Sequence, residues 1–124
     1  MDMKTKVSEL IALGALCKLR RKELNLTQGE LAEMAGISAQ STVCRIEKGE
    51  LNVPFTSLLG LEAVLRIPLL ELTREVMLGV RSRIYLDPAD DNRNLIRSWA
   101  QATLRSHHRA EMKKLNLPEQ VGPQ

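Results

Sequence analysis

The sequence predicts an all-α protein, a compact helical bundle followed by a C-terminal helical extension. Apolar residues recur at one-turn spacings along most of the 124-residue chain, and capping residues, glycines and prolines divide it into short segments. Aromatic residues make up only 2% of the chain, so its core must be aliphatic, which suits small helical bundles better than β-sandwiches or barrels. The length allows one domain with its own core and is too short for two.

The first helix is expected to begin near Thr5 or Val7 and to end at Glu23. Apolar residues at helical spacing mark its buried side, namely Leu10, Leu13, Leu16, Cys17 and Leu24. The run from residue 10 to residue 17 also imitates a short lipoprotein signal. The charged Glu9 abuts this run and the segment continues smoothly as a helix, so we expect no signal there.

The segment from residue 24 to residue 49 predicts two short helices joined by a tight turn. Thr27 and Glu30 have the spacing of a capping box, so the first of these helices should begin there. Gly36 should end it, because glycine adopts the left-handed conformation that a sharp helix exit needs. Ser38 is then the expected cap of the second helix.

The second of these short helices has two different sides. Val43 and Ile46, at i, i+3 spacing, supply its buried side. Its exposed side carries polar residues, namely Gln40, Ser41, Thr42 and Arg45. The major groove of B-DNA admits one α-helix, and the side chains on the first turns of such a helix read the bases.

Two more helices are expected after a loop over residues 49–54. The first should run from about Thr56 to Leu65, and the second should begin near Pro68 and end near residue 78. Residues 79–86 fit a short strand about as well as a helix extension, and we favour the helix.

A last helix should begin at Asp87 and Pro88, which can serve as its cap and first turn, and should run to about Leu115. Its apolar face is narrow and includes Leu95, Trp99, Ala102 and Thr103. Such a helix must pack on something, either back on the bundle or against its twin in a dimer. We therefore predict a domain over residues 7–78, a helical extension over 79–117 that serves as a dimerisation element, and a disordered tail over 118–124.

A series of motifs in the region from about residue 16 to residue 72 carries a family resemblance. They are Arg21, Leu26-Thr27-Gln28, Leu31-Ala32, Gly36-Ile37-Ser38, Val43-Cys44-Arg45-Ile46-Glu47-Lys48-Gly49 and Pro54. In content and order they resemble the XRE family, the lambda-repressor-like transcription regulators of bacteria and phages. The resemblance implies a five-helix DNA-binding bundle whose partner is double-stranded DNA. The chain departs from the family pattern by one additional residue between Gly36 and Val43.

The resemblance also implies roles for individual residues. Gln40 is the expected adenine reader, since its amide offers a donor and an acceptor, and Arg45 suits guanine or a phosphate. Ser41 and Thr42 either touch bases or simply tolerate solvent, and the additional residue makes Ala39 a further candidate. Three residues are candidates for contacts with the DNA backbone, namely Gln28, Lys48 and Asn52.

Arg21 and Glu47 occupy positions that family members use for an ion pair between the first helix and the recognition helix. We therefore assign them a structural role. The C-terminal arginines drift around their helix and indicate a solvated face more than a DNA-binding stripe, namely Arg93, Arg97, Arg105 and Arg109. His107 and His108 lack further ligands at a suitable spacing, so no metal site is expected.

Bulk properties exclude several classes of protein. The net charge of +3 is compatible with a polyanionic partner but does not require one. Two cysteines do not make a disulfide framework, which favours the reducing cytoplasm, and no run of about 20 apolar residues could span a membrane. Paired carboxylates, a glycine-rich phosphate loop and a nucleophile with a matched base are all missing from the sequence, so we expect neither an enzyme nor a cofactor.

The sequence thus predicts a transcription regulator, by family default a repressor, that binds a near-palindromic operator as a homodimer. Contact with RNA polymerase would make the same fold an activator. The alternative is an antitoxin whose C-terminal extension binds a toxin protein while the helix-turn-helix regulates its own operon. The operator sequence, any effector and the dimer geometry lie beyond what the sequence determines.

Overall fold

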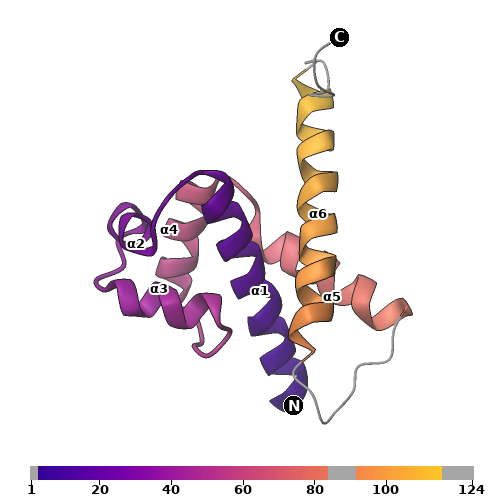
Figure 1. The fold of residues 1–124 in the computed structure, drawn as a ribbon, viewed down its shortest axis with the longest axis horizontal. Coiled ribbons are helices and arrows are strands. Elements are labelled where there is room, and N and C mark those ends of the chain that lie inside the picture. The colour runs from indigo at the N-terminus through magenta and orange to yellow at the C-terminus, as the bar shows by residue number, and fades with distance from the viewer. Residues whose placement is uncertain (1–2, 84–91, 116–124) are drawn as a thin grey trace.

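The computed structural model of the protein describes residues 3–83 and 92–115, and the regular structure in these ranges is entirely helical. The helices are α1 (Met3–Glu23), α2 (Gln28–Ala35), α3 (Gln40–Glu47), α4 (Phe55–Leu65), α5 (Leu69–Arg83) and α6 (Arg93–Lys114). Figure 1 shows α1 in the middle, with α2, α3 and α4 on one side of it and α5 and α6 on the other. The all-α prediction is confirmed.

The core is a continuous aliphatic cluster to which every helix contributes. Its fully buried side chains include Leu16 of α1, Leu31 of α2, Ile46 of α3, Leu61 of α4 and Val76 of α5. Burial of each side chain of this size typically stabilises a fold by roughly 1.5–3 kcal/mol. These residues recur at the helical spacings seen in the sequence, which is why the periodicity predicted the bundle.

A glycine allows α1 and α3 to approach each other closely. A Cβ atom at Gly14 would clash with the backbone carbonyl oxygens of Ile46 and Glu47. The main chain of α1 therefore packs directly against the end of α3 and fixes its position. This contact was not evident from the sequence, because nothing local to Gly14 indicates what lies opposite it.

Helix α5 is longer than the sequence indicated. It continues through Gly79 to Arg83, which confirms the helical alternative for 79–83, while residues 84–86 lie outside the described residues. The proposed boundary between residues 78 and 79 therefore falls inside one continuous helix. The α5 backbone also lies close to α6, since a Cβ at Gly79 would meet the ring of Trp99 at 2.9 Å.

The extension folds back on the bundle, which is one of the two alternatives left open by the sequence. Helix α6 buries Ile96, Ala100 and Leu104 against α1 and α5. The buried row lies one residue away from the predicted face, so the assignment of Ala102 to that face is wrong, and its side chain is exposed. The expected start at Asp87 and Pro88, like the tail over 118–124, lies outside the described residues, and the described helix begins at Arg93.

Two side-chain contacts fasten α6 at widely separated points. Near its start, Arg93 donates to the backbone carbonyl of Lys48, the residue that follows α3. Further along, His108 Nε2 lies 2.9 Å from Glu23 Oε1 at the end of α1. None of the helices in the described ranges is both long and apolar enough to cross a membrane.

Candidate nucleic-acid interface

Helix α2 begins and ends as its sequence predicts. The Thr27 hydroxyl accepts from the Glu30 backbone N–H at 3.1 Å, and the Thr27 backbone N–H donates to the Glu30 carboxylate at 2.9 Å. Gly36 closes the helix in the left-handed conformation, with φ of 75°, and its N–H reaches two carbonyls of the last turn. The capping box and the glycine cap are both confirmed, and they hold the turn that leads into α3.

Helix α3 begins one residue later than expected. Its N-cap is Ala39 rather than Ser38, and the alanine side chain offers no capping hydrogen bond, so the prediction that Ser38 caps this helix is wrong. The backbone of Ala39 is extended, with φ of −142° and ψ of 141°, so this residue and not Ser38 stands directly before the first helical turn. The helix proper then begins at Gln40, three residues before Val43.

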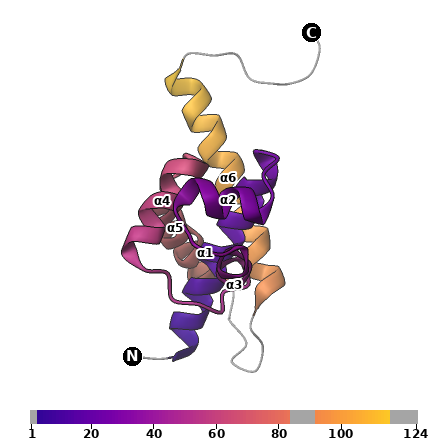
Figure 2. The ribbon, with the colours of Figure 1, turned by 90° about the vertical axis from the view of Figure 1, so that its left-hand side faces the viewer.

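The two sides of α3 differ sharply in burial. Val43 and Ile46 are 1% and 2% exposed and hold the helix against the core. Gln40, Ser41 and Arg45 are exposed on the other side, and Thr42 is partly buried. Ala39 is partly buried just before the first turn. In Figure 2, which looks at this side of the molecule, α2 and α3 lie in front and α6 lies behind α1, so α6 leaves the outward side of α3 uncovered.

The beginning of α2 lies next to the beginning of α3. A Cβ atom at Gly29 would be 3.9 Å from Gln40 Oε1, which places the Gln40 side chain over the first turn of α2. Gln28, the first residue of α2, is partly buried beside it. The structure thus brings two of the candidate DNA-binding residues together at the two helix starts.

Arg21, Glu47 and Gln28 form one network beneath α3. The Arg21 guanidinium donates to both carboxylate oxygens of Glu47, from Nε at 2.7 Å and from Nη2 at 3.1 Å, and also to the Leu26 carbonyl. The Glu47 side chain is 2% exposed. A buried carboxylate needs such a partner, because an unpaired charge in the interior is very costly.

The side-chain amide of Gln28 makes a hydrogen bond within the protein. Its Nε2 donates to Glu47 Oε1 at 3.1 Å. The sequence indicated a phosphate contact for this residue and gave no sign of the link to Glu47, which lies 19 positions away. The amide nitrogen is thus engaged in the network beneath α3, while the side chain as a whole keeps partial exposure.

The loop after α3 holds the remaining candidates. Lys48 and Asn52 are both exposed, and Gly49 turns the chain with φ of 74°. The Lys48 side chain makes no ion pair within the described part of the chain. Its backbone carbonyl accepts a hydrogen bond from the Arg93 guanidinium of α6. Sequence reasoning missed this role of Arg93, because the two residues are 45 positions apart and no local pattern connects them.

The two cysteines differ in their surroundings. Cys17 is 1% exposed, and burial together with the nearby charge of Glu47 raises the pKa of its thiol well above the ordinary value. Cys44 is partly buried on α3 and is also a free thiol. Within the described ranges, no group of three or more histidine, cysteine or acidic residues lies together in a way that could hold a metal ion.

Part of the chain matches a known protein family. Residues 18–72 match the family described as "Helix-turn-helix", a stretch that runs from α1 through α2, α3 and α4 into α5. No curated protein and no solved structure matches the chain.

Proposed function

Residues 18–72 belong to the XRE family of helix-turn-helix DNA-binding regulators, and from this premise we propose that the protein is a sequence-specific repressor. It binds a near-palindromic operator as a homodimer and inserts α3 into the major groove. The observation that carries this proposal is the exposed polar side of α3 above a fully buried apolar side. A helix so held can reach base edges without disturbing the core.

Gln40 and Arg45 are the proposed base-reading residues. Gln40 stands on the first turn of α3, and its amide can accept from N6 and donate to N7 of one adenine in a bidentate contact. Arg45 lies further along the exposed side and is suited to guanine or to a phosphate. Ala39, Ser41 and Thr42 complete the surface that would face the groove.

Gln28, Lys48 and Asn52 are the proposed backbone contacts. They lie at the start of α2 and in the loop after α3, on either side of the proposed reading surface. Contacts of this kind fix the position of the protein on DNA and carry no sequence information. One N–H of the Gln28 amide donates to Glu47, so the contact with a phosphate would use the second N–H of the same nitrogen.

A dimer follows from the small number of base contacts that one module can make. Two modules placed about 34–36 Å apart gain affinity and read an inverted repeat. The apolar side of α6 is already covered by α1 and α5, so the dimer surface is better sought elsewhere. Leu70 and Leu78, both more than half exposed on α5, are the candidates for it.

The toxin-binding alternative rests on a charge-rich extension that lies outside the family core. The packing of the apolar side of α6 on the bundle leaves only the polar side of this helix for a protein partner. The DNA-binding regulator is the function that the geometry supports best.

The test is a selection of bound sequences from random double-stranded DNA with the full-length protein. We expect an enriched inverted repeat whose half-sites are centred about 10–10.5 base pairs apart. Gln40→Ala should cost about 1–3 kcal/mol of binding free energy and relax one base position in each half-site. Lys48→Gln should weaken binding to all sequences alike and reduce its salt dependence.

Arg105→Gln is the matched control, since Arg105 is an exposed cation on α6 outside the proposed surface. This variant should recover the same sequences as the wild type. The proposal would be overturned if the selection enriched no sequence, or if Gln40→Ala enriched the same sequences as the wild type. Transcription in vitro from a promoter that carries the recovered site then distinguishes repression from activation.

A further inference from the structure

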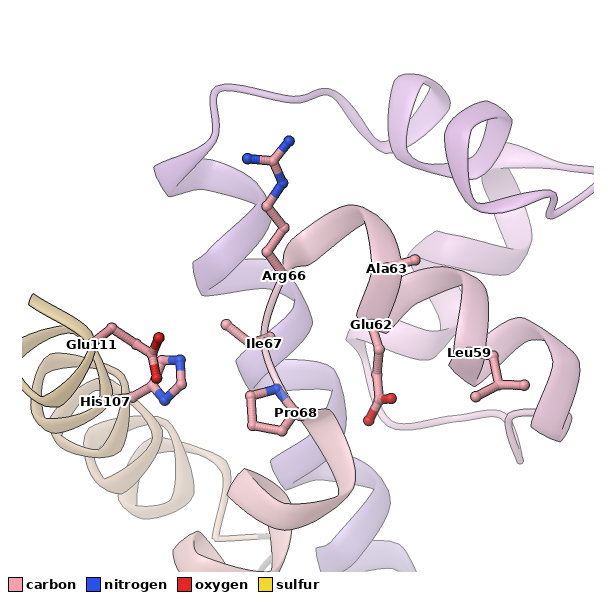
Figure 3. Close-up of a pocket in the computed structure, with 8 residues that line it drawn as sticks. All are labelled: Leu59, Glu62, Ala63, Arg66, Ile67, Pro68, His107 and Glu111. Atoms are coloured by element: carbon pink, nitrogen blue, oxygen red, sulfur yellow. The ribbon is translucent and has the colours of Figure 1, made fainter. Parts of the chain in front are cut away.

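Three hollows in the described part of the chain are lined partly by α6, and they differ in the charge of their walls. The largest, about 510 Å³, opens between α6 and the turn from α4 to α5. Figure 3 shows His107 and Glu111 of α6 facing Ile67 and Pro68 across it. Its charged residues are of both signs, so it selects no particular ligand charge.

The second, about 290 Å³, lies between α5 and α6 and is lined by three carboxylates and one ammonium group. The third, about 270 Å³, is strongly basic. It lies between α1, the end of α3 and the first half of α6, and we call it the basic cleft. Five cationic side chains line it, namely Lys18, Lys22, Lys48, Arg93 and Arg97. Its apolar floor comes from α1 and includes Ile11, Ala15 and Leu19.

Most of this positive charge is not neutralised by the protein. Lys18, Lys22, Lys48 and Arg97 form no ion pair in the part of the chain that the structure describes. Arg93 differs, since it donates to the Lys48 carbonyl. Like charges gathered around a concave surface repel one another, and a bound anion would relieve that repulsion.

Among the described residues that line the basic cleft, one carboxylate is present, and it does not compensate for these cations. It belongs to Glu47, whose two oxygens already accept from Arg21 and whose Oε1 also accepts from Gln28. The Glu47 side chain is only 2% exposed, so its carboxylate faces the interior and not the opening of the cleft. The cleft therefore presents a net positive wall to any ligand that enters.

We propose that the basic cleft binds a small, multiply charged phosphate compound and that this ligand regulates DNA binding. Ammonium and guanidinium groups from two helices can converge on phosphate oxygens, and a guanidinium can donate two parallel hydrogen bonds to them. The volume suits a diphosphate or a compact phosphate ester and lies near the lower end of the range for ligand pockets. A DNA duplex is too large to enter the cleft.

Regulation follows from the position of Lys48, and this half of the inference rests on the proposed function. Lys48 lines the cleft, caps the end of α3 and is a proposed contact with the DNA backbone. An anion held in the cleft would compete with DNA for the Lys48 charge. By linkage, the DNA would weaken binding of the anion by the same factor.

The first measurement is isothermal titration calorimetry of pyrophosphate into the full-length protein without DNA, with ionic strength held constant by sodium chloride. We expect saturable binding to one site per chain. Lys18→Gln combined with Arg97→Gln should weaken it by roughly tenfold or more, because hydrogen bonds between charged groups typically contribute at least that factor. Arg105→Gln, which removes one α6 cation outside the cleft, should bind as the wild type does.

The proposed site would be overturned if pyrophosphate showed no saturable binding, or if Arg105→Gln lost as much pyrophosphate affinity as the double variant. Lys18 is partly buried and Arg97 is exposed, and circular dichroism of the double variant would verify that it folds. This experiment contains no DNA, so its result is independent of whether the proposed function holds.

The second measurement is the affinity of the protein for its selected DNA with pyrophosphate or with chloride at equal ionic strength. Pyrophosphate should weaken DNA binding by the wild type and leave the double variant unaffected. Equal DNA affinities in the two salts would overturn the regulatory half. A double variant with weaker DNA binding and a shallower salt dependence would instead assign the cleft to DNA phosphates and also overturn the proposal.

Discussion

At the scale of single residues, the network of Arg21, Glu47 and Gln28 decides whether α3 is held in place. Glu47 is the last residue of α3, and its carboxylate is buried. It is therefore stabilised by the ion pair with the Arg21 guanidinium of α1. Gln40 and Arg45 are exposed on the same helix and take no part in this network. Mutations in the network should therefore change stability first, whereas mutations on the exposed side should change DNA binding alone.

The ion pair gives a prediction for stability. Arg21→Met should lower the free energy of unfolding by about 3–5 kcal/mol, because it leaves the Glu47 carboxylate buried without a cation. Urea denaturation followed by circular dichroism measures the loss. Arg105→Gln is the surface control and should stay within about 0.5 kcal/mol of the wild type.

The double variant Arg21→Met with Glu47→Leu should recover much of the lost stability, since no charge is then left unpaired in the interior. If Arg21→Met alone were as stable as the wild type, the pair would have no structural role.

At the scale of helices, the contact between α1 and α3 depends on Gly14. Gly14→Ala should destabilise the protein by about 1–3 kcal/mol although alanine is the better helix former, because the added methyl group meets the backbone of α3. Gly29→Ala in α2 is the matched control. Its methyl group would make only ordinary contacts at 3.9 Å, so this variant should be neutral or more stable by up to about 1 kcal/mol.

Thermal or urea unfolding of the two variants side by side measures this difference. Equal effects of the two substitutions would show that the close approach of α1 and α3 is not required. If Gly14→Ala both lowers the free energy of unfolding and weakens DNA binding, the packing of α1 against α3 also positions α3 for DNA.

The contact between α1 and α6 gives a prediction for pH. Partial burial acts to raise the pKa of the Glu23 carboxyl, but hydrogen bonds from His108 and Arg20 outweigh it, so the pKa is lowered from its ordinary 4.5. A carboxylate with a lowered pKa stabilises the folded state above that ordinary value. The stabilisation is lost as the pH falls below 4.5 and through the folded-state pKa.

His108→Ala should therefore be less stable than the wild type at pH above 4.5, by less than about 1 kcal/mol because the pair is half exposed. The difference should shrink as the pH falls further. Urea denaturation of both proteins over a series of pH values tests this, and a difference that grows on acidification would contradict it.

At the scale of the whole molecule, α6 shares its core with the DNA-binding domain. Leu104 is 2% exposed on α6, which packs on both α1 and α5. Leu104→Ala should lower the free energy of unfolding by about 2–5 kcal/mol through the cavity it leaves. We expect α6 and the bundle to unfold in one cooperative transition.

Calorimetry and circular dichroism, recorded on the wild type and on Leu104→Ala, check this prediction. Coincident transitions by both methods are the expected result. Two separate transitions, with only one of them shifted by the substitution, would show that α6 is an independent unit.

The sequence by itself determined the features that depend on neighbours along the chain. The capping box of Thr27 and Glu30, the Gly36 cap and the two sides of α3 follow from residues within a few positions of one another, and each could be predicted. The start of α3 was misplaced by one residue, because the side chain of Ser38 favours a cap whereas the backbone places Ala39 at that position.

Only the tertiary structure decided which surfaces meet. The carbonyl of Lys48 accepts a hydrogen bond from Arg93, and α6 packs on the bundle instead of remaining free. The basic cleft is formed by residues from three helices. Such contacts depend on the packing of faces that are far apart in sequence, and a helical period specifies which side of a helix is apolar but not what covers it.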